Sequence, residues 1–151
     1  MKKNVLIING PNLNLLGKRE PNIYGSTTLN EVKEKCQDKA SSYNTEVVFF
    51  QSNKEGEIID VIQDAPNKYN GIIINPGAYS HTSIAIMDAL KVVKMPIIEV
   101  HISNIFKREE FRRHSYVSLV ADGVICGLGT AGYELALDAI IKIINQHGDK
   151  F

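Results

Sequence analysis

Short apolar runs alternate with amphipathic segments along the whole chain. Each run is a few residues long and rich in valine and isoleucine, and the runs cover residues 5–8, 47–50, 71–74, 97–100 and 123–126. Continuous rather than alternating hydrophobicity is typical of strands that a parallel sheet buries on both faces. The pattern therefore predicts five strands of a parallel sheet, with both faces of each strand buried.

The segments between and after these runs repeat their apolar residues with the period of a helix. The first segment begins with Thr28 and Glu31, which have the spacing of a capping box. The second is entered through Ser52 and Glu55, and the third ends near Pro96. The last, residues 133–144, is apolar on most sides, so we expect the sheet or another subunit to cover it. The first three are marked by Leu29, Val32, Cys36 and Ala40, by Ile58, Ile59, Ile62 and Ala65, and by Ile84, Ala85, Ala89, Leu90 and Val93.

Strands alternating with helices predict an open α/β sheet with right-handed crossovers. For five strands the commonest doubly wound order is 2-1-3-4-5, the flavodoxin-like arrangement. The chain has 151 residues and no internal repeat, low-complexity tract or linker, so we expect residues 1–151 to form one domain. Sheets of this kind bind ligands outside the carboxyl ends of their strands, and the loops that follow the strands are therefore the candidate sites.

The loop after the first strand, residues 9–25, is much longer than the roughly two to six residues usual in α/β units. Long loops of this kind are commonly lids or binding loops. The alternative is a disordered surface excursion, but two prolines and several apolar residues count against it.

The third and fourth predicted strands end near side chains that can bind a ligand or transfer a proton. Asn75 ends the third strand, and Ser80 and His81 stand where the next helix begins. Capping explains the hydroxyl but not an asparagine and a histidine at the same place. On the fourth strand Glu99 and His101 point to one face by the period of two, as a general acid/base pair requires. A purely structural role for this histidine remains an open alternative.

Composition narrows the classes of partner. Lysine plus arginine and aspartate plus glutamate both number 17, so the formal net charge is zero, which argues against a nucleic-acid or anionic-membrane binder. The apolar runs are too short for a membrane span or a signal peptide, and we expect a cytoplasmic protein. Cys36 and Cys126 are too few for a disulfide framework or a metal knuckle, and we expect both to be buried small hydrophobes.

The four arginines are confined to two segments, whereas lysines are spread along the chain. Arg19 lies in the long loop, and a helical turn would place Arg108 and Arg112 on one side. The planar guanidinium suits recognition of carboxylates. A solvated basic patch is the alternative, because Glu109 and Glu110 are interleaved with these arginines.

The last loop, residues 127–132, matches the G-x-G-x-x-G pattern of dinucleotide sites. That motif needs a following strand and an acidic residue about 20 positions later, and only one helix and a polar tail remain. We therefore expect these glycines to serve close backbone packing rather than nucleotide binding.

Taken together, several of these segments closely resemble the type II 3-dehydroquinate dehydratases. The resemblance runs from the first strand to the final helix. It is carried by NGPNLN at 9–14, REPNIYG at 19–25, NPGAYSHTS at 75–83, EVHISN at 99–104 and REEFR at 108–112.

The resemblance implies a hydro-lyase that reversibly removes water from 3-dehydroquinate to give 3-dehydroshikimate, a step of aromatic biosynthesis or of quinate breakdown. It also implies a flavodoxin-like fold, no metal, Schiff base or other cofactor, and self-association of trimers into a dodecamer.

The resemblance also assigns roles by position. Tyr24 matches the base that takes a proton from C2, and Arg19 matches the group that stabilises the developing charge. His101 matches the acid that protonates the departing C1 hydroxyl, with Glu99 as its orienting partner. Asn12 matches a residue that helps hold the enolate. The positions matched to substrate contacts are Asn75, His81, Ile102, Ser103 and Arg112, with Arg108 beside them and Asp88 supplied by a neighbouring subunit.

A non-catalytic flavodoxin-like binding or signalling module is the alternative function. A flavin carrier needs a phosphate loop rich in serine and threonine after the first strand, and residues 9–14 offer none. A phosphoacceptor receiver needs acidic residues at the ends of the first and third strands, where this chain has Asn9 and Asn75.

Overall fold

The computed structural model describes residues 2–18 and 20–147. Within them, five parallel strands form one sheet in the order β2-β1-β3-β4-β5, which confirms the predicted flavodoxin-like order. Each strand contains the apolar run that predicted it. The strands are β1 (Lys3–Asn9), β2 (Thr45–Gln51), β3 (Gly71–Asn75), β4 (Ile97–His101) and β5 (Gly123–Cys126).

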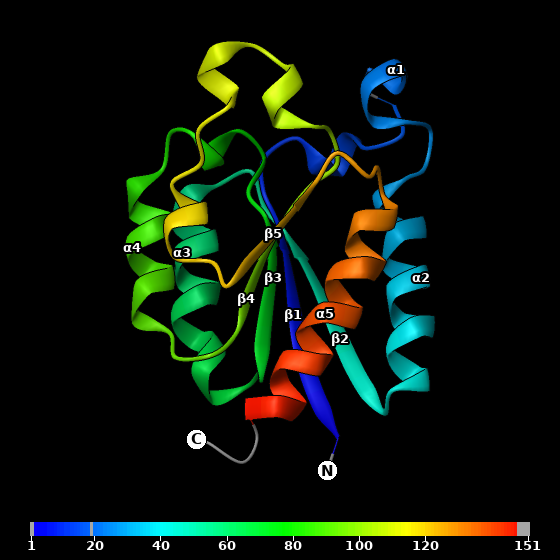
Figure 1. Cartoon of the computed structure of the whole chain (residues 1–151), viewed down its shortest axis with the longest axis vertical. Coiled ribbons are helices and arrows are strands. Elements are labelled where there is room, and N and C mark those ends of the chain that lie inside the picture. Colours follow the sequence, from blue (N-terminus) through cyan, green and yellow to red (C-terminus); the bar gives the residue numbers. More distant parts are fainter. Residues whose placement is uncertain (1, 19, 148–151) are drawn as a thin grey trace.

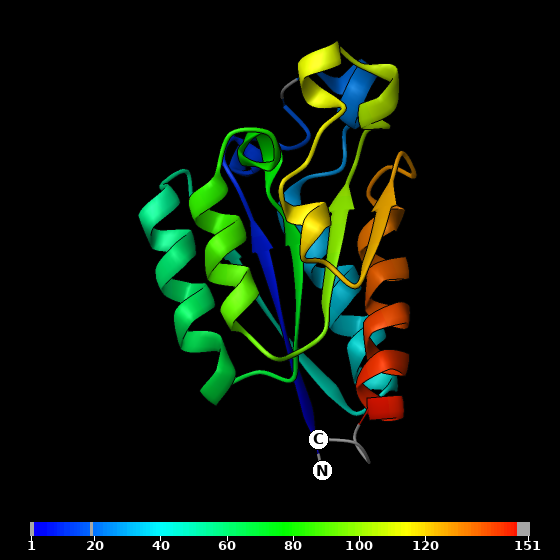
Figure 2. The same cartoon turned by 60° about the vertical axis from the view of Figure 1, so that its left-hand side comes forward.

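Helices cover both faces of the sheet (Figures 1 and 2). The pair α2 (Leu29–Ser42) and α5 (Ala131–His147) packs on one face, and the pair α3 (Glu55–Asp64) and α4 (Ile84–Val92) packs on the other. A further short helix, α1 (Pro21–Tyr24), stands on the loop after β1, beyond the carboxyl edge of the sheet. In the described part of the chain, no helix is long and apolar enough to cross a membrane.

Alternation along the central strands builds two cores. Val5 and Ile7 of β1 face α2 and α5, whereas Leu6 and Ile8 face α3 and α4, because successive strand residues point to opposite faces. All four side chains are fully buried. The continuous apolar run in the sequence therefore reflects burial on both faces of this strand.

The predicted capping box begins α2. The Glu31 amide donates to the Thr28 hydroxyl oxygen at 3.2 Å, and the hydroxyl donates to the Glu31 carboxylate at 3.2 Å. Val32, Cys36 and Ala40 are buried on the predicted face, and burial raises the pKa of the Cys36 thiol to about 12. This thiol is therefore a small apolar side chain in practice.

The two edge strands depart from the expected burial on both faces. Val48 of β2 is 43% exposed and Val124 of β5 is 45% exposed, because the core beneath α3 and α4 draws mainly on β1, β3 and β4. Cys126, expected to be buried, is only half-buried for the same reason. A run of apolar letters does not distinguish an edge strand from a central one.

The glycine-rich loop after β5 is used for packing. The Gly127 amide donates to the His101 carbonyl at 3.2 Å, and the Gly129 amide donates to the Ile102 carbonyl at 3.0 Å. A Cβ at Gly127 would lie 2.9 Å from the Asn104 Cβ. These amides are occupied by the end of β4, so they support it rather than cradle a phosphate.

Truncation of a buried side chain tests the core. Ile8→Ala removes a fully buried side chain and should lower the free energy of unfolding by about 2–5 kcal/mol. The control Val92→Ala alters a side chain that is 77% exposed and should change it by no more than about 0.5 kcal/mol. Urea unfolding at a fixed protein concentration measures both values, and equal losses would contradict the core assignment.

Candidate active site

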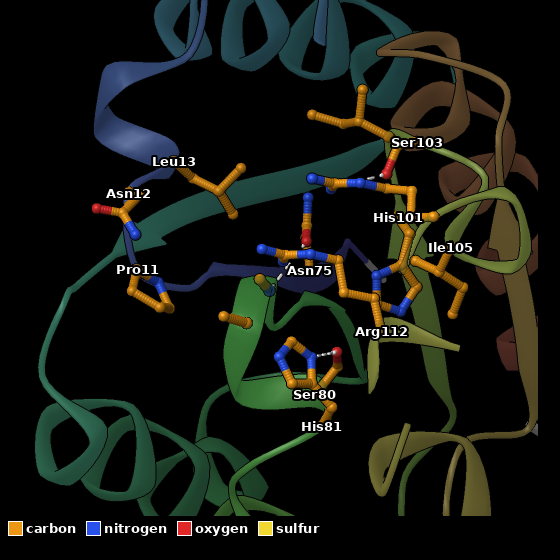
Figure 3. A pocket seen from close by; sticks show the side chains of 14 residues that line it. Pro11, Asn12, Leu13, Asn75, Ser80, His81, His101, Ser103, Ile105 and Arg112 are labelled. Atoms are coloured by element: carbon orange, nitrogen blue, oxygen red, sulfur yellow. Dashed lines mark hydrogen bonds between the residues drawn. The ribbon is translucent and has the colours of Figure 1, made fainter. Parts of the chain in front are cut away.

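A cavity of about 220 Å³ opens at the carboxyl ends of β1, β3 and β4. Figure 3 shows Arg112 pointing into it, with Asn75 at its base and His81 and His101 on its wall. It is also lined by Pro11, Leu13, Gly77, Ala78, Ser80 and Ile105, which the sequence analysis did not assign to a site. The predicted site residues that line it are Asn12, Asn75, His81, His101, Ile102, Ser103, Arg108 and Arg112.

The loop after β1 is pressed against the loop after β3. A Cβ at Gly10 would lie 2.3 Å from the Pro76 carbonyl oxygen, so only glycine fits there. Two residues later Asn12 has φ 69°, a left-handed conformation that asparagine tolerates better than most residues. Its amide donates to Asn53 Oδ1 at 3.0 Å. These contacts fix where the long loop leaves the sheet.

A buried polar network holds Asn75 from below. Asn75 Nδ2 donates to the Tyr133 hydroxyl at 2.8 Å, and that hydroxyl donates to Asn9 Oδ1 at 2.7 Å. Asn75 Oδ1 accepts from the Gly77 amide at 3.2 Å. Tyr133 is fully buried on α5, which raises the pKa of its hydroxyl, so this group stays neutral. The sequence did not reveal Tyr133, because a tyrosine on an apolar helix is typical of an ordinary core position.

His81 supplies a neutral imidazole to the cavity. Burial, and then the positive charge of Arg112 and the fields of His101, His114 and Arg108, lower the pKa of His81 below its ordinary value of 6.5. The ring centroid lies 5.9 Å from that of Phe111. A neutral imidazole both donates and accepts hydrogen bonds, which suits a ligand that carries hydroxyl groups.

The predicted pair of Glu99 and His101 is present at the end of β4. The Glu99 side chain is fully buried, and its Oε2 pairs with His101 Nε2. Ser115 also donates to Oε2, at 2.6 Å, and Ser118 donates to Oε1 at 2.5 Å. No local pattern in the sequence identifies these two serines as partners of Glu99.

The Glu99 carboxylate remains ionised despite its burial. Burial raises its pKa, but the hydrogen bond and charge of His101, with hydrogen bonds from Ser115 and Ser118, outweigh that effect and hold the pKa below its ordinary value. A carboxylate on Nε2 fixes the tautomer of the ring and stabilises the imidazolium. Because Nε2 faces Glu99, Nδ1 is the nitrogen left to exchange a proton with a ligand. The pair can therefore work as a general acid or base.

The segment after β4 places two positively charged side chains at the cavity. Arg108 and Arg112 both line it, and the Arg112 Nε donates to the Glu109 carboxylate. This place at the cavity counts against the alternative of a solvated basic patch for these two arginines, although Glu109 is a partner as their interleaving indicated. Two guanidinium groups at one cavity favour an anionic ligand. Within residues 2–18 and 20–147, no group of three or more histidine, cysteine, aspartate or glutamate side chains is arranged so that it could hold a metal ion.

Two predicted site residues, Glu99 and Asp88, do not line this cavity, and the side chains of two others lie outside the described residues. Glu99 lies behind His101 and acts through it. Asp88 is exposed on α4 and does not line the cavity. Arg19 and the side chain of Tyr24 lie outside the described residues; the Tyr24 backbone belongs to α1.

Comparison with known proteins gives consistent matches. A family model described as dehydroquinase class II matches residues 3–141. The 3-dehydroquinate dehydratase of Polynucleobacter asymbioticus is 57% identical over 148 residues, which cover 96% of this chain and 98% of that protein. The catabolic 3-dehydroquinase of Phaeosphaeria nodorum is 53% identical over 99% of this chain and 98% of its own length. The crystal structure of type II dehydroquinase from Propionibacterium acnes superposes with a TM-score of 0.90 at 45% identity, covering 94% of this chain and 98% of that one.

The buried carboxylate makes stability depend on pH. Because the pKa of Glu99 in the folded state lies below the reference value of 4.5, its ionised form stabilises the fold above that pH, and this contribution is lost as the pH falls through the folded-state pKa. We therefore expect the free energy of unfolding to fall on acidification below about pH 4.5. Glu99→Gln should remove part of that decline.

Urea unfolding across this pH range measures the effect. Glu57→Gln is the matched control, because Glu57 also accepts a serine hydrogen bond, from Ser52 at 2.7 Å, but is exposed. Identical pH profiles for Glu99→Gln and the unmodified chain would contradict the assigned charge state.

Proposed function

The chain belongs to the class II dehydroquinases and is a 3-dehydroquinate dehydratase, and we propose that it removes water through an enolate, with Tyr24 as base and His101 as acid. The observation that carries this assignment is the buried pair of Glu99 and His101 at the wall of a cationic cavity. Membership of an enzyme family makes the alternative of a non-catalytic module wrong.

The first step breaks the C2–H bond beside the ketone. The Tyr24 phenolate takes the proton, and the electron pair moves onto the ketone oxygen to give the enolate. A free tyrosine has a pKa of about 10, so the phenolate needs nearby cations. Arg19, five positions earlier on the same loop, supplies that charge in this proposal. Asn12, on the cavity wall, helps hold the enolate.

The second step breaks the C1–O bond. The enolate electrons restore the ketone and form the C1=C2 double bond, while His101 gives a proton to the departing hydroxyl, which leaves as water. The closeness of Glu99 to His101 Nε2 supports this role, because a carboxylate partner orients the ring for the transfer. Tyr24 and His101 return to their starting states by exchanging protons with solvent.

The other cavity residues bind the substrate in this proposal. Arg112 is assigned to the carboxylate, since its guanidinium points into the cavity and has the matching planar geometry. Asn75 and the neutral His81 are assigned to hydroxyl groups. Ile102, Ser103 and Arg108 complete the wall.

Asp88 enters the proposal through a neighbouring subunit. It is exposed on α4 and does not line the cavity of its own chain, which leaves it accessible to another copy. We propose that trimers, assembled further into a dodecamer, place it at the site of that copy. The long loop that carries Arg19 and Tyr24 then closes over the bound substrate and excludes water.

Turnover of 3-dehydroquinate tests the two catalytic assignments. Product formation creates a conjugated enone, which is followed by ultraviolet absorbance. His101→Ala and Tyr24→Phe should each lower kcat by about a hundredfold to ten-thousandfold. The matched control is Tyr43→Phe, because Tyr43 is exposed and does not line the cavity. Near-normal turnover in His101→Ala or Tyr24→Phe would refute the role of that residue.

The subunit assignment is tested by substituting Asp88. Asp88→Ala should lower turnover about tenfold or more through loss of a charge-assisted hydrogen bond, without altering the native mass. The control Asp60→Ala changes an exposed acid on α3 and should leave turnover unchanged. A fully active monomer in native mass spectrometry and sedimentation would rule out a shared site.

A further inference from the structure

Two serines hold the only fully buried carboxylate in the described part of the chain. We propose that Ser115 and Ser118 are positioning residues for the dehydration. Their hydrogen bonds stabilise the negative charge of Glu99 after His101 has given its proton to the departing hydroxyl. This inference rests on the proposed role of His101 as the acid.

The Glu99 carboxylate accepts hydrogen bonds from two kinds of donor, an imidazole and two hydroxyl groups. Oε2 is shared by His101 Nε2 and the Ser115 hydroxyl, whereas Oε1 is held by the Ser118 hydroxyl at 2.5 Å. Among the described residues, the hydrogen bonds recorded to this carboxylate come from these three groups alone. Apart from the imidazole itself, the donors are therefore uncharged.

Uncharged donors suit a proton-donating pair. While His101 is an imidazolium, its positive charge compensates the buried carboxylate. Once the proton has left, a bare carboxylate remains in a dry environment, which is costly without hydrogen bonds. The two hydroxyls stabilise that state most and so favour release of the proton. A lysine or arginine in their place would neutralise Glu99 permanently and weaken its hold on the imidazolium.

The chain fixes both serines independently of any ligand. Val117, between them, is fully buried in the core beneath α3 and α4. The Tyr116 amide donates to the Ser80 carbonyl at 2.7 Å, and a short 3₁₀ turn over Val117–Leu119 carries Ser118. The hydroxyls therefore reach Glu99 from a backbone that is anchored in the core and against the loop after β3.

Other titratable groups surround the pair, and all are the same in the variants below. His81 lies on the loop after β3, and Arg108 and Arg112 lie on the segment after β4. His114 acts on His81 through its charge, and Cys126 is the register partner of His101 in β5. A difference between the unmodified chain and a serine variant therefore reports on the serine.

The test compares Ser115→Ala, Ser118→Ala and the double variant with the unmodified chain. Ser52→Ala is the matched control, because Ser52 is a buried serine that donates to Glu57 at 2.7 Å outside the cavity. Ser118→Thr retains the hydroxyl at a position with room for a methyl group, since Ser118 is exposed, and serves as the rescue variant. Circular dichroism verifies folding, and Ser118→Ala carries the test if the double variant does not fold.

The first measurement is the titration of the His101 ring by NMR on histidine-labelled protein, assigned with His101→Gln. Loss of the hydroxyls penalises the deprotonated pair most, so the pair should keep its last proton to a pH about half a unit to one unit higher in the double variant. The second measurement is turnover of 3-dehydroquinate. A weaker acid should lower kcat about threefold to tenfold, while KM stays within about twofold.

The outcomes separate the two proposals. The inference is supported if the double variant loses the last proton of the pair at a higher pH and has a lower kcat, while Ser118→Thr and Ser52→Ala behave like the unmodified chain. It is overturned if the pH of that proton loss does not change, if kcat does not change, or if only KM rises. Absence of turnover in the unmodified chain, or full turnover in His101→Ala, contradicts the proposed mechanism itself rather than the role of the serines.

Discussion

The site depends on the burial of one carboxylate at the end of β4. An ionised Glu99 without partners would cost several kcal/mol, so the surrounding chain must bring donors to both of its oxygens. His101 comes from the same strand, two residues on, but Ser115 and Ser118 require the chain to leave the sheet and return. The segment between β4 and β5 makes that return. Its outer part carries Arg108 and Arg112 to the cavity, and its inner part is anchored by Val117.

A second, neutral network supports the other wall. Tyr133 joins Asn9 and Asn75, which end the neighbouring strands β1 and β3. Because the tyrosine hydroxyl donates once and accepts once, it determines which atom of each amide faces it, and the remaining atoms of Asn75 are oriented accordingly. Two separate buried networks thus support the site. The network at β4 holds the charged Glu99 behind His101, and the network at β1 and β3 orients the neutral side chain of Asn75.

The sequence predicted the features that depend on local periodicity. The α/β class followed from the alternation of apolar runs and helices, and the strand order was the commonest one for five strands. The pairing of Glu99 with His101 followed from the two-residue repeat of a strand. The serines lie 16 and 19 residues from Glu99, and Tyr133 lies 58 residues from Asn75. Such contacts arise only when crossovers bring distant segments together, and a loop serine or a helix tyrosine has no local pattern that identifies its partner. The exposure of Val48 and Val124 was missed for a related reason, because edge position is a property of the sheet rather than of the strand.

The position of the acid on the fold has a consequence for the order of events that we propose. His101 is held on a central strand by a carboxylate that two anchored hydroxyls fix, so it is in place before substrate arrives. The proposed base, Tyr24, belongs to a short helix on the long loop after β1, whose first part is tied to the sheet at Gly10 and Asn12 and by the buried Leu13 and Leu16. In the mechanism that we propose, the acid is already placed when the enolate forms, and the elimination follows on a preorganised site. In the same proposal, closure of the long loop brings the base to the substrate and so sets the moment at which the C2–H bond is broken.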